Sequence, residues 1–275
     1  MSRLEARDVT IGYDGRVVAE HLNVRIPDHS FTVIAGPNAC GKSTLLRALS
    51  RLLKPSHGAV HLDGQLIRTL PSKEVARRVG LLPQSAVTPE GITVADLVAR
   101  GRYPHQTMLR QWSTRDADIV AESLRATGVE TLATRYVDEL SGGQRQRVWL
   151  AMALAQQTPV LLLDEPTTFL DIAHQIEVLD LCADLHAEAG RTLVAVLHDL
   201  NHACRYATHL IVLKDGRVVA EGPPEQIMSA ELVREVYGLA CRVIEDPESG
   251  TPLIIPKVRR AGAVSSISDR RVGGP

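Results

Sequence analysis

The chain contains Gly36-Pro37-Asn38-Ala39-Cys40-Gly41-Lys42-Ser43-Thr44, which fits the phosphate-binding pattern G-x-x-x-x-G-K-[ST]. Apolar residues 31–35 precede this stretch and the helix-forming residues 45–49 follow it, so the context predicts a buried strand, a glycine-rich turn and a helix start. In such a turn the backbone N–H groups surround phosphate oxygens, Lys42 reaches the β- and γ-phosphates, and the Ser43 hydroxyl binds Mg²⁺. The sequence therefore predicts a site for a nucleoside triphosphate and Mg²⁺.

A second peptide, Leu140-Ser141-Gly142-Gly143-Gln144, stands directly before a strong helix former over residues 145–155. A hydroxyl and two glycines at a helix start can form another anion site, because the N-terminal end of a helix is positive. The simpler alternative is that Ser141 only caps the helix.

Two apolar runs end in side chains that can do chemistry. Residues 160–163 lead into Asp164-Glu165, and residues 192–197 lead into His198. A carboxylate pair in this place can hold Mg²⁺ through Asp164 and deprotonate a water through Glu165; the alternative is an acidic turn. His198 and His202 have a spacing that occurs in zinc sites, but the sequence offers no third ligand.

These motifs, in this order, resemble the ATP-binding subunit of an ABC transporter, whose signature peptide is LSGGQ. The resemblance implies that Ser141 to Gln144 of one copy contact the γ-phosphate of ATP held by a second copy, so that the working ATPase is a dimer. It also implies catalytic roles for Lys42, Glu165 and His198. Further implied contacts are Gln84, at the position of the family's Q-loop, with Mg²⁺, Asp171 with nucleotide, and Tyr13 with adenine.

The fold class follows from the order of strands and turns. Hairpins are predicted at three Asp-Gly turns, whose aspartates are Asp14, Asp63 and Asp215. Between them, short apolar strands alternate with helical stretches, at residues 31–35, 79–83, 160–163 and 192–197. This rhythm is typical of an α/β fold with a mostly parallel sheet. Together with the resemblance, it predicts a P-loop NTPase core of the ABC ATPase type, with an antiparallel β subdomain and an inserted α-helical subdomain.

We expect residues 1–260 to form a single ABC ATPase domain. Its expected parts are a core (1–85 and 159–240), a helical subdomain (86–158) and a C-terminal extension (241–260). The last residues, 261–275, are rich in Ser, Gly and Arg, and we expect a disordered tail there.

Composition excludes several function classes. The net charge is −1, from 31 basic and 32 acidic residues, so no basic surface for nucleic acid is indicated. The longest apolar stretch, Val148 to Ala155, is far shorter than the ~20 residues that span a bilayer. The first eight residues lack the apolar core of a signal peptide, and four scattered cysteines are typical of reduced cytoplasmic thiols. We therefore expect a peripheral subunit on the cytoplasmic face of a bacterial inner membrane, bound to integral-membrane permease subunits.

The resemblance extends beyond the motifs to most of the chain, and within the family it points to the ATPases of bacterial ferric-siderophore importers, above all ferric-enterobactin importers. The segments that carry it are residues 99–105, 197–207, 236–238 and 250–256. It implies an indirect partner, a periplasmic or surface siderophore-binding protein. The alternatives are importers of vitamin B12, haem or another metal chelate, and a soluble ABC ATPase of DNA repair or translation. A single cassette without a heptad run favours transport.

Three finer expectations concern individual side chains. Cys40 lies beside amides, Lys42 and a helix start, which favours a reactive thiolate that nucleotide shields, and the alternative is an inert side chain that points into the sheet. Ala39 stands where many ABC ATPases have glycine, which matters little provided that this position needs no positive φ. Basic and aromatic side chains that follow Gln84 in the chain are candidates for seating the permease, and they are Arg100, Arg102, Tyr103 and His105.

Overall fold

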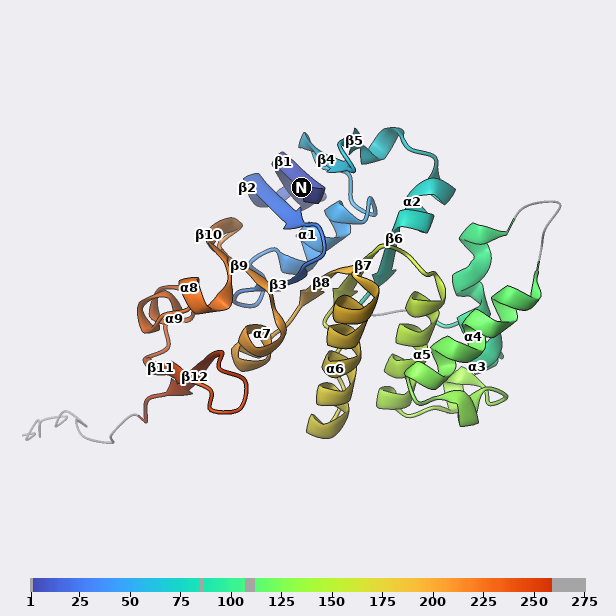
Figure 1. The fold of residues 1–275 in the computed structure, drawn as a ribbon. Helices are drawn as coiled ribbons and strands as arrows, with labels where there is room; N and C mark the ends of the chain where they lie inside the picture. The colour runs from blue at the N-terminus through green and yellow to red at the C-terminus, as the bar shows by residue number, and fades with distance from the viewer. Residues whose placement is uncertain (1, 85–86, 107–111, 259–275) are drawn as a thin grey trace, which may run out of the picture.

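The computed structural model describes residues 2–84, 87–106 and 112–258, and the tail expected at 261–275 lies outside these ranges. Figure 1 shows an antiparallel sheet at the N-terminal end, a central mostly parallel sheet, a group of helices beyond β6, and a small C-terminal hairpin on the opposite side of the molecule from those helices. This arrangement confirms the predicted fold class.

The antiparallel sheet has the strand order β2-β1-β4-β5. Its strands are β1 (Ser2–Tyr13), β2 (Arg16–Pro27), β4 (His57–Leu62) and β5 (Gln65–Leu66). Asp14 and Gly15 join β1 to β2 with φ values of 48° and 79°, which is the pair of left-handed residues that a two-residue hairpin requires. All three predicted Asp-Gly hairpins are confirmed, the third joining β9 to β10 at Asp215-Gly216.

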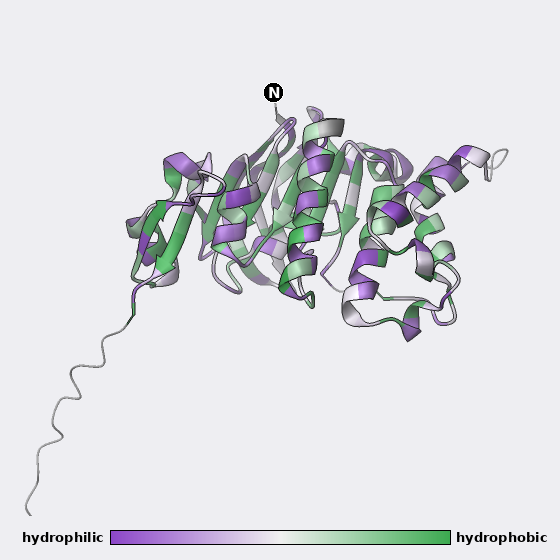
Figure 2. Cartoon of the chain, turned by 60° about the horizontal axis from the view of Figure 1, so that its bottom comes forward, coloured by the Kyte–Doolittle hydropathy of each residue, from purple (hydrophilic) through white to green (hydrophobic). Residues whose placement is uncertain are grey.

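The central sheet has the order β10-β9-β3-β8-β7-β6, with β10 antiparallel and the other neighbours parallel. Its strands are β3 (Phe31–Ala35), β6 (Val79–Leu82), β7 (Val160–Asp164), β8 (Thr192–Val196), β9 (His209–Lys214) and β10 (Arg217–Gly222). Every residue of β3, β7 and β8 is buried, as expected of parallel strands that are covered on both faces. Figure 2 shows these strands as largely hydrophobic.

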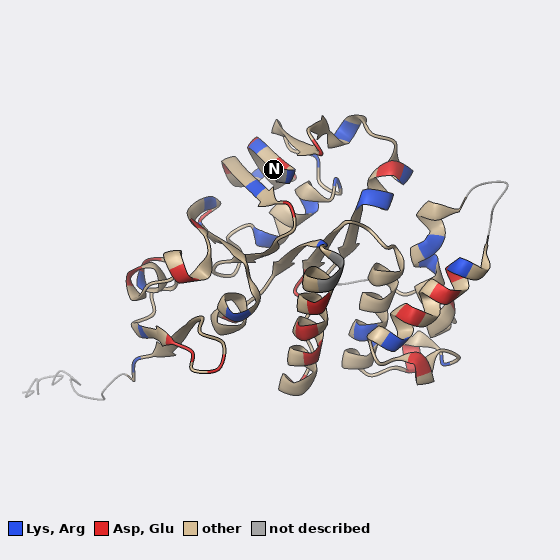
Figure 3. Ribbon diagram, in the orientation of Figure 1, with Lys and Arg blue, Asp and Glu red and all other residues tan. Residues whose placement is uncertain are grey.

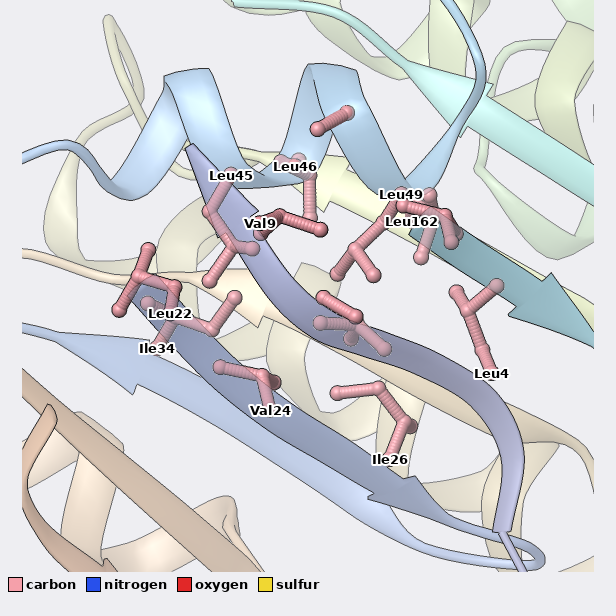
Figure 4. Packing of buried hydrophobic residues seen from close by; sticks show 14 of the residues in the cluster. Leu4, Val9, Leu22, Val24, Ile26, Ile34, Leu45, Leu46, Leu49 and Leu162 are labelled. Carbon is pink, nitrogen blue, oxygen red and sulfur yellow. The ribbon is translucent and has the colours of Figure 1, made fainter. Parts of the chain in front are cut away.

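Two layers cover the central sheet. On one face, α1 (Lys42–Leu49) lies between the two sheets, and Figure 4 shows its Leu45, Leu46 and Leu49 packed among Val9 of β1 and Leu162 of β7. A second apolar cluster on the other face includes residues of four helices, α6 (Ile172–Ala189), α7 (Leu200–Tyr206), α8 (Pro224–Ile227) and α9 (Ala230–Tyr237). The P-loop helix is therefore fixed by apolar contacts with both sheets.

A third cluster forms inside the helical part that follows β6. Its helices are α3 (Val94–Ala99), α4 (Thr114–Ala126) and α5 (Gly142–Ala155), while α2 (Ser72–Arg78) precedes β6. Helix α5 belongs to two clusters, because Leu150 and Leu154 pack toward the sheet, whereas Val148 and Ala151 pack toward α3 and α4. A helix with apolar residues on both sides is a buried one. Short 3₁₀ segments connect these elements, at Ile67–Thr69, Arg100–His105, Glu130–Leu132 and Val137–Glu139.

The C-terminal strands β11 (Cys241–Glu245) and β12 (Pro252–Pro256) form a separate antiparallel hairpin. It lies next to α7, where Asn201 hydrogen bonds to the backbone of Ile254. None of the helices in the described ranges has both the length and the apolar character needed to cross a membrane.

Arg102 is an internal residue rather than a surface one. It is 5% exposed, its Nε donates to Asp116 Oδ1 at 2.9 Å, and its Nη1 donates to the carbonyl oxygen of Ala155 at 2.7 Å. The expectation that Arg102 helps to seat a permease is therefore wrong, because it joins α4 to the end of α5. His105 likewise contacts the carbonyl oxygen of Gln156, whereas Arg100 and Tyr103 are exposed.

We predict that Arg102→Met lowers the free energy of unfolding by about 3–5 kcal/mol, because it leaves the buried Asp116 carboxylate without its cation. The matched variant Arg100→Met removes an exposed arginine two residues away and should change the free energy of unfolding by less than about 0.5 kcal/mol. Urea unfolding followed by tryptophan fluorescence measures both. Equal midpoints for the two variants would contradict this assignment.

Candidate functional site

The P-loop connects the end of β3 to the start of α1, and glycine is required at both ends of it. A Cβ at Gly36 would lie 2.2 Å from the carbonyl oxygen of Leu213, and Gly41 has φ 105°. Lys42 is 5% exposed, and its Nζ donates to the carbonyl oxygens of Gly36 and Pro37 at 2.9 and 2.7 Å. The ammonium group is thus held within the loop that the sequence predicted to bind phosphates.

Ser43 and Asp164 meet at the base of the P-loop. The Ser43 hydroxyl donates to Asp164 Oδ1 at 2.8 Å, although the two residues are 121 positions apart. Burial raises the pKa of Asp164, and the neighbouring Glu165 charge adds to this, while the Ser43 hydrogen bond opposes it. A hydroxyl and a carboxylate oxygen that converge on one point form a donor set suited to a hard cation.

The Glu165 carboxylate contacts donors from three separate segments. It accepts from Gln84 Nε2 at 2.8 Å and from Thr168 Oγ1 at 3.2 Å, and His198 Nε2 lies 2.7 Å from its Oε1. Gln84, Glu165 and His198 follow the neighbouring strands β6, β7 and β8, whose carboxyl ends meet at one edge of the sheet. Sequence analysis missed Thr168, although a hydroxyl three residues after an acidic residue in a turn is a recognisable signal.

A cavity of about 940 Å³ opens at this edge. It brings together most of the predicted nucleotide-site residues. Its walls are formed by Tyr13, Asp14, Arg16, Val17, Val18, Asn38, Ala39, Gly41, Lys42, Ser43, Thr44, Gln84, Glu165 and His198. Tyr13 is 39% exposed, and its hydroxyl accepts from Arg47 Nη1 at 3.0 Å. Arg16, Val17 and Val18 were not predicted, but they follow Tyr13 across the Asp14-Gly15 turn.

The signature peptide and Asp171 do not line this cavity. Ser141 caps α5 in a capping box, in which its hydroxyl accepts from the Gln144 N–H and the Gln144 side chain accepts from the Ser141 N–H. Asp171 similarly caps α6 by accepting from the N–H of His174. Ser141 therefore caps the helix, and a contact of this peptide with the nucleotide of a second copy stays a prediction. Among the described wall residues of the cavity, none comes from Ser141 to Gln144.

A family model described as ABC transporter matches residues 19–168, which contain the P-loop, the signature peptide and Glu165. This chain belongs to the ABC transporter family. As a member of it, the chain is an ATP-binding ATPase subunit, and the sequence-based resemblance is confirmed.

Proteins with described functions are similar in sequence to this chain over almost its whole length. The ferric enterobactin transport ATP-binding protein of Escherichia coli is 56% identical over 266 residues, which are 97% of this chain and 98% of that protein. A Bacillus subtilis protein described as a probable siderophore transport system ATP-binding protein is 52% identical, over 94% of each chain. Among solved structures, a dimeric post-hydrolysis ATP-binding cassette with bound ADP and Pi has a TM-score of 0.72 and 30% identity, and the match covers 80% of this chain and 98% of that one.

Two expectations about the P-loop of this ABC ATPase are wrong. Cys40 is 4% exposed and belongs to the apolar cluster around α1, and burial raises the pKa of its thiol more than Lys42 lowers it. The thiol is therefore not an activated thiolate. Ala39 has φ 62°, so the condition under which its substitution for glycine matters little does not hold.

We predict that Ala39→Gly raises the free energy of unfolding by up to about 1.5 kcal/mol. Glycine removes a left-handed strain of about 1–2 kcal/mol, and the added freedom of the unfolded chain offsets about 0.4–1 kcal/mol of it. The control is Ala121→Gly on the exposed face of helix α4, where the same change should lower stability by about 1 kcal/mol. In urea unfolding without nucleotide, the midpoint should rise for Ala39→Gly and fall for Ala121→Gly. A loss of stability in both variants would exclude strain at Ala39.

Proposed function

We propose that this chain is the ATP-hydrolysing subunit of an importer for iron(III)–siderophore complexes. The observation that carries the proposal is the 56% identity with the ferric enterobactin transport ATP-binding protein along nearly the full length of both chains. The second relative, described as part of a siderophore transport system, supports the same substrate class. Importers of vitamin B12, haem or other metal chelates are the alternatives.

Two copies of the chain form the working ATPase in this proposal. Each ATP lies between the P-loop of one copy and Ser141 to Gln144 of the other, which explains why the signature peptide caps a helix outside the nucleotide cavity. Phe169 and Ile172, exposed by 79% and 78%, flank Asp171 on the surface next to Gly142. Burying each side chain against a second copy would contribute about 1.5–3 kcal/mol.

The donor atoms at the base of the P-loop fit Mg²⁺. Ser43 and Asp164 would hold the ion, with Gln84 nearby, because these residues offer hydroxyl, carboxylate and amide oxygens. When bound, Mg²⁺ would neutralise charge on the β- and γ-phosphates.

Three residues of the chain would have separate roles in ATP hydrolysis. Lys42 would exchange its two carbonyl contacts for phosphate oxygens of ATP. Glu165 would accept a proton from the attacking water, and His198, whose Nε2 reaches the Glu165 carboxylate, would position that water against the γ-phosphate. Since the closed pair contacts the γ-phosphate and the open pair does not, ATP favours closure and hydrolysis favours opening.

The proposed place of work is the cytoplasmic face of the inner membrane, with peripheral attachment through permease subunits. Gln84 and the segment 86–112, of which the structure describes residues 87–106 and 112, would transmit closure to the permease. A periplasmic or surface binding protein would deliver the siderophore from the other side. No nucleic-acid partner is proposed, because Lys and Arg are interspersed with Asp and Glu in the view of Figure 3 and the net charge is −1.

The first test concerns hydrolysis. We predict that Glu165→Gln lowers kcat by ~10²–10⁴-fold while ATP binding remains, because the general base is lost and the phosphate site is intact. An ATP-bound dimer should then accumulate in gel filtration with MgATP. Glu122→Gln, which neutralises an exposed carboxylate on α4, should behave like the unaltered protein. Turnover at the normal rate in Glu165→Gln would remove this residue from its role.

The second test concerns the substrate. Cells that carry Lys42→Ala in place of the unaltered chain should lose uptake of radiolabelled iron(III)–siderophore, with ferric enterobactin as the first probe, and should keep uptake of cobalamin. Lys42→Ala suits this comparison because loss of this lysine removes phosphate binding in an ABC ATPase whatever its substrate. The reverse pattern, with cobalamin uptake lost and siderophore uptake kept, would replace the proposed substrate with a cobalamin.

A further inference from the structure

Helix α7 determines where His198 can lie. The helix starts at Leu200, two residues after His198, and Asp199 caps it by accepting from the N–H groups of Asn201 and His202 at 2.7 and 3.0 Å. The His198 side chain is 48% exposed, so little packing surrounds its ring. The position of the histidine relative to Glu165 therefore depends on the backbone that runs directly into α7.

The C-terminal hairpin holds α7 at two points. Asn201 Oδ1 accepts from the Ile254 N–H at 2.7 Å, and Asn201 Nδ2 donates to the Ile254 carbonyl oxygen at 3.4 Å. One turn later, Arg205 Nη2 lies 2.8 Å from Asp246 Oδ2 at the end of β11. We call these contacts the α7 clamp. Asp246 is itself fixed, because it accepts from the Ser249 hydroxyl and the Glu248 N–H.

The Asn201 side chain pairs backbone groups of β12 in the way that a neighbouring strand would. The N–H and C=O of Ile254 bond to Asn201, so the Asn201 amide satisfies backbone groups that a further strand would otherwise pair. The Ile254 side chain is 5% exposed and belongs to the same apolar cluster as Ala203 and Cys204 of α7. A displacement of the hairpin would therefore break hydrogen bonds and expose apolar surface on α7 together.

We propose that the hairpin Cys241–Pro256 is a positioning element of the ATPase site, with Asn201 and Arg205 as positioning residues. The clamp fixes α7, α7 fixes His198, and His198 then meets Glu165 at the observed 2.7 Å. The proposal rests on the catalytic role proposed for His198. The hairpin lies beyond residues 19–168 that match the family model, so it adds to the site a support from outside the phosphate-binding motifs.

The test measures ATPase kinetics of the full-length chain in complex with its permease. Asn201→Ala should lower kcat by about tenfold, which is less than the ~100-fold that a 1 Å misplacement of a reacting group can cost. KM for ATP should stay within about twofold, because Tyr13 and the P-loop do not contact the clamp. Arg205→Glu should act in the same direction, and Asn201→Asp, which keeps the acceptor for the Ile254 N–H, should recover part of kcat.

The matched control is Asn23→Ala. Asn23 also bridges backbone groups, since its side chain accepts from the Asp8 N–H at 3.0 Å and donates to the His21 carbonyl oxygen at 3.1 Å, but it lies on β2. Its loss should leave kcat unchanged. An equal fall of kcat in Asn201→Ala and Asn23→Ala, or a loss of thermal stability in Asn201→Ala with normal kcat, would reduce the clamp to a structural contact.

Hydrogen exchange separates this proposal from the proposed function. In Asn201→Ala, the backbone amides of residues 197–203 should exchange faster than in the unaltered chain, and in Asn23→Ala they should not. This readout does not require hydrolysis. If the unaltered complex does not hydrolyse ATP, the proposed function fails while faster exchange still supports the clamp; unchanged exchange overturns the clamp whatever the ATPase rate.

Discussion

The site depends on one buried carboxylate. Glu165 is 8% exposed and contacts Gln84, Thr168 and His198, which come from three separate segments. A carboxylate at this depth needs such donors, because burying a charge without partners is costly. Gln84 and His198 are available only because β6, β7 and β8 are parallel neighbours whose carboxyl ends meet, whereas Thr168 lies in the same turn as Glu165. The order of strands in the sheet therefore brings together side chains that are far apart in the sequence, since Gln84 and Glu165 are separated by 81 positions.

The fold and the main phosphate motifs were predictable because their signals are local. An apolar strand before a glycine-rich turn, and Asp-Gly between two strands, report backbone conformations that a few neighbouring residues determine. The environment of Arg102 was not predictable in this way, because its partners Asp116 and Ala155 come from α4 and α5. The prediction that Cys40 is a reactive thiolate was wrong for a geometric reason. The Cys40 side chain is absent from the wall of the nucleotide cavity and lies in the apolar cluster around α1.

Helix α5 connects the signature peptide to the rest of the molecule. It begins with the capping box at Ser141, and its two sides belong to the clusters of the central sheet and of the helical part. Arg102 closes the far end of this helix by donating to the carbonyl oxygen of Ala155. Because close-packed clusters do not deform smoothly, a shift of the signature peptide requires α3, α4 and α5 to move together. Because Leu150 and Leu154 of α5 also belong to the cluster of the central sheet, motion of the helical part against the sheet would have to repack that contact.

Backbone strain shows which parts of the site resist such motion. Ala39, Glu165 and Phe169 are non-glycine residues with φ values of 62°, 54° and 66°. Each such position costs about 1–3 kcal/mol and persists only where the surrounding structure fixes it. Ala39 is fixed by the P-loop, Glu165 by its three donors, and Phe169 by the turn in which the Leu170 N–H donates to the Thr167 carbonyl oxygen. These strained positions cluster around the nucleotide cavity and the surface proposed for the second copy. A site held this firmly gains little from loop rearrangement, so we place the proposed ATP-dependent movement between rigid parts and between copies rather than within the loops themselves.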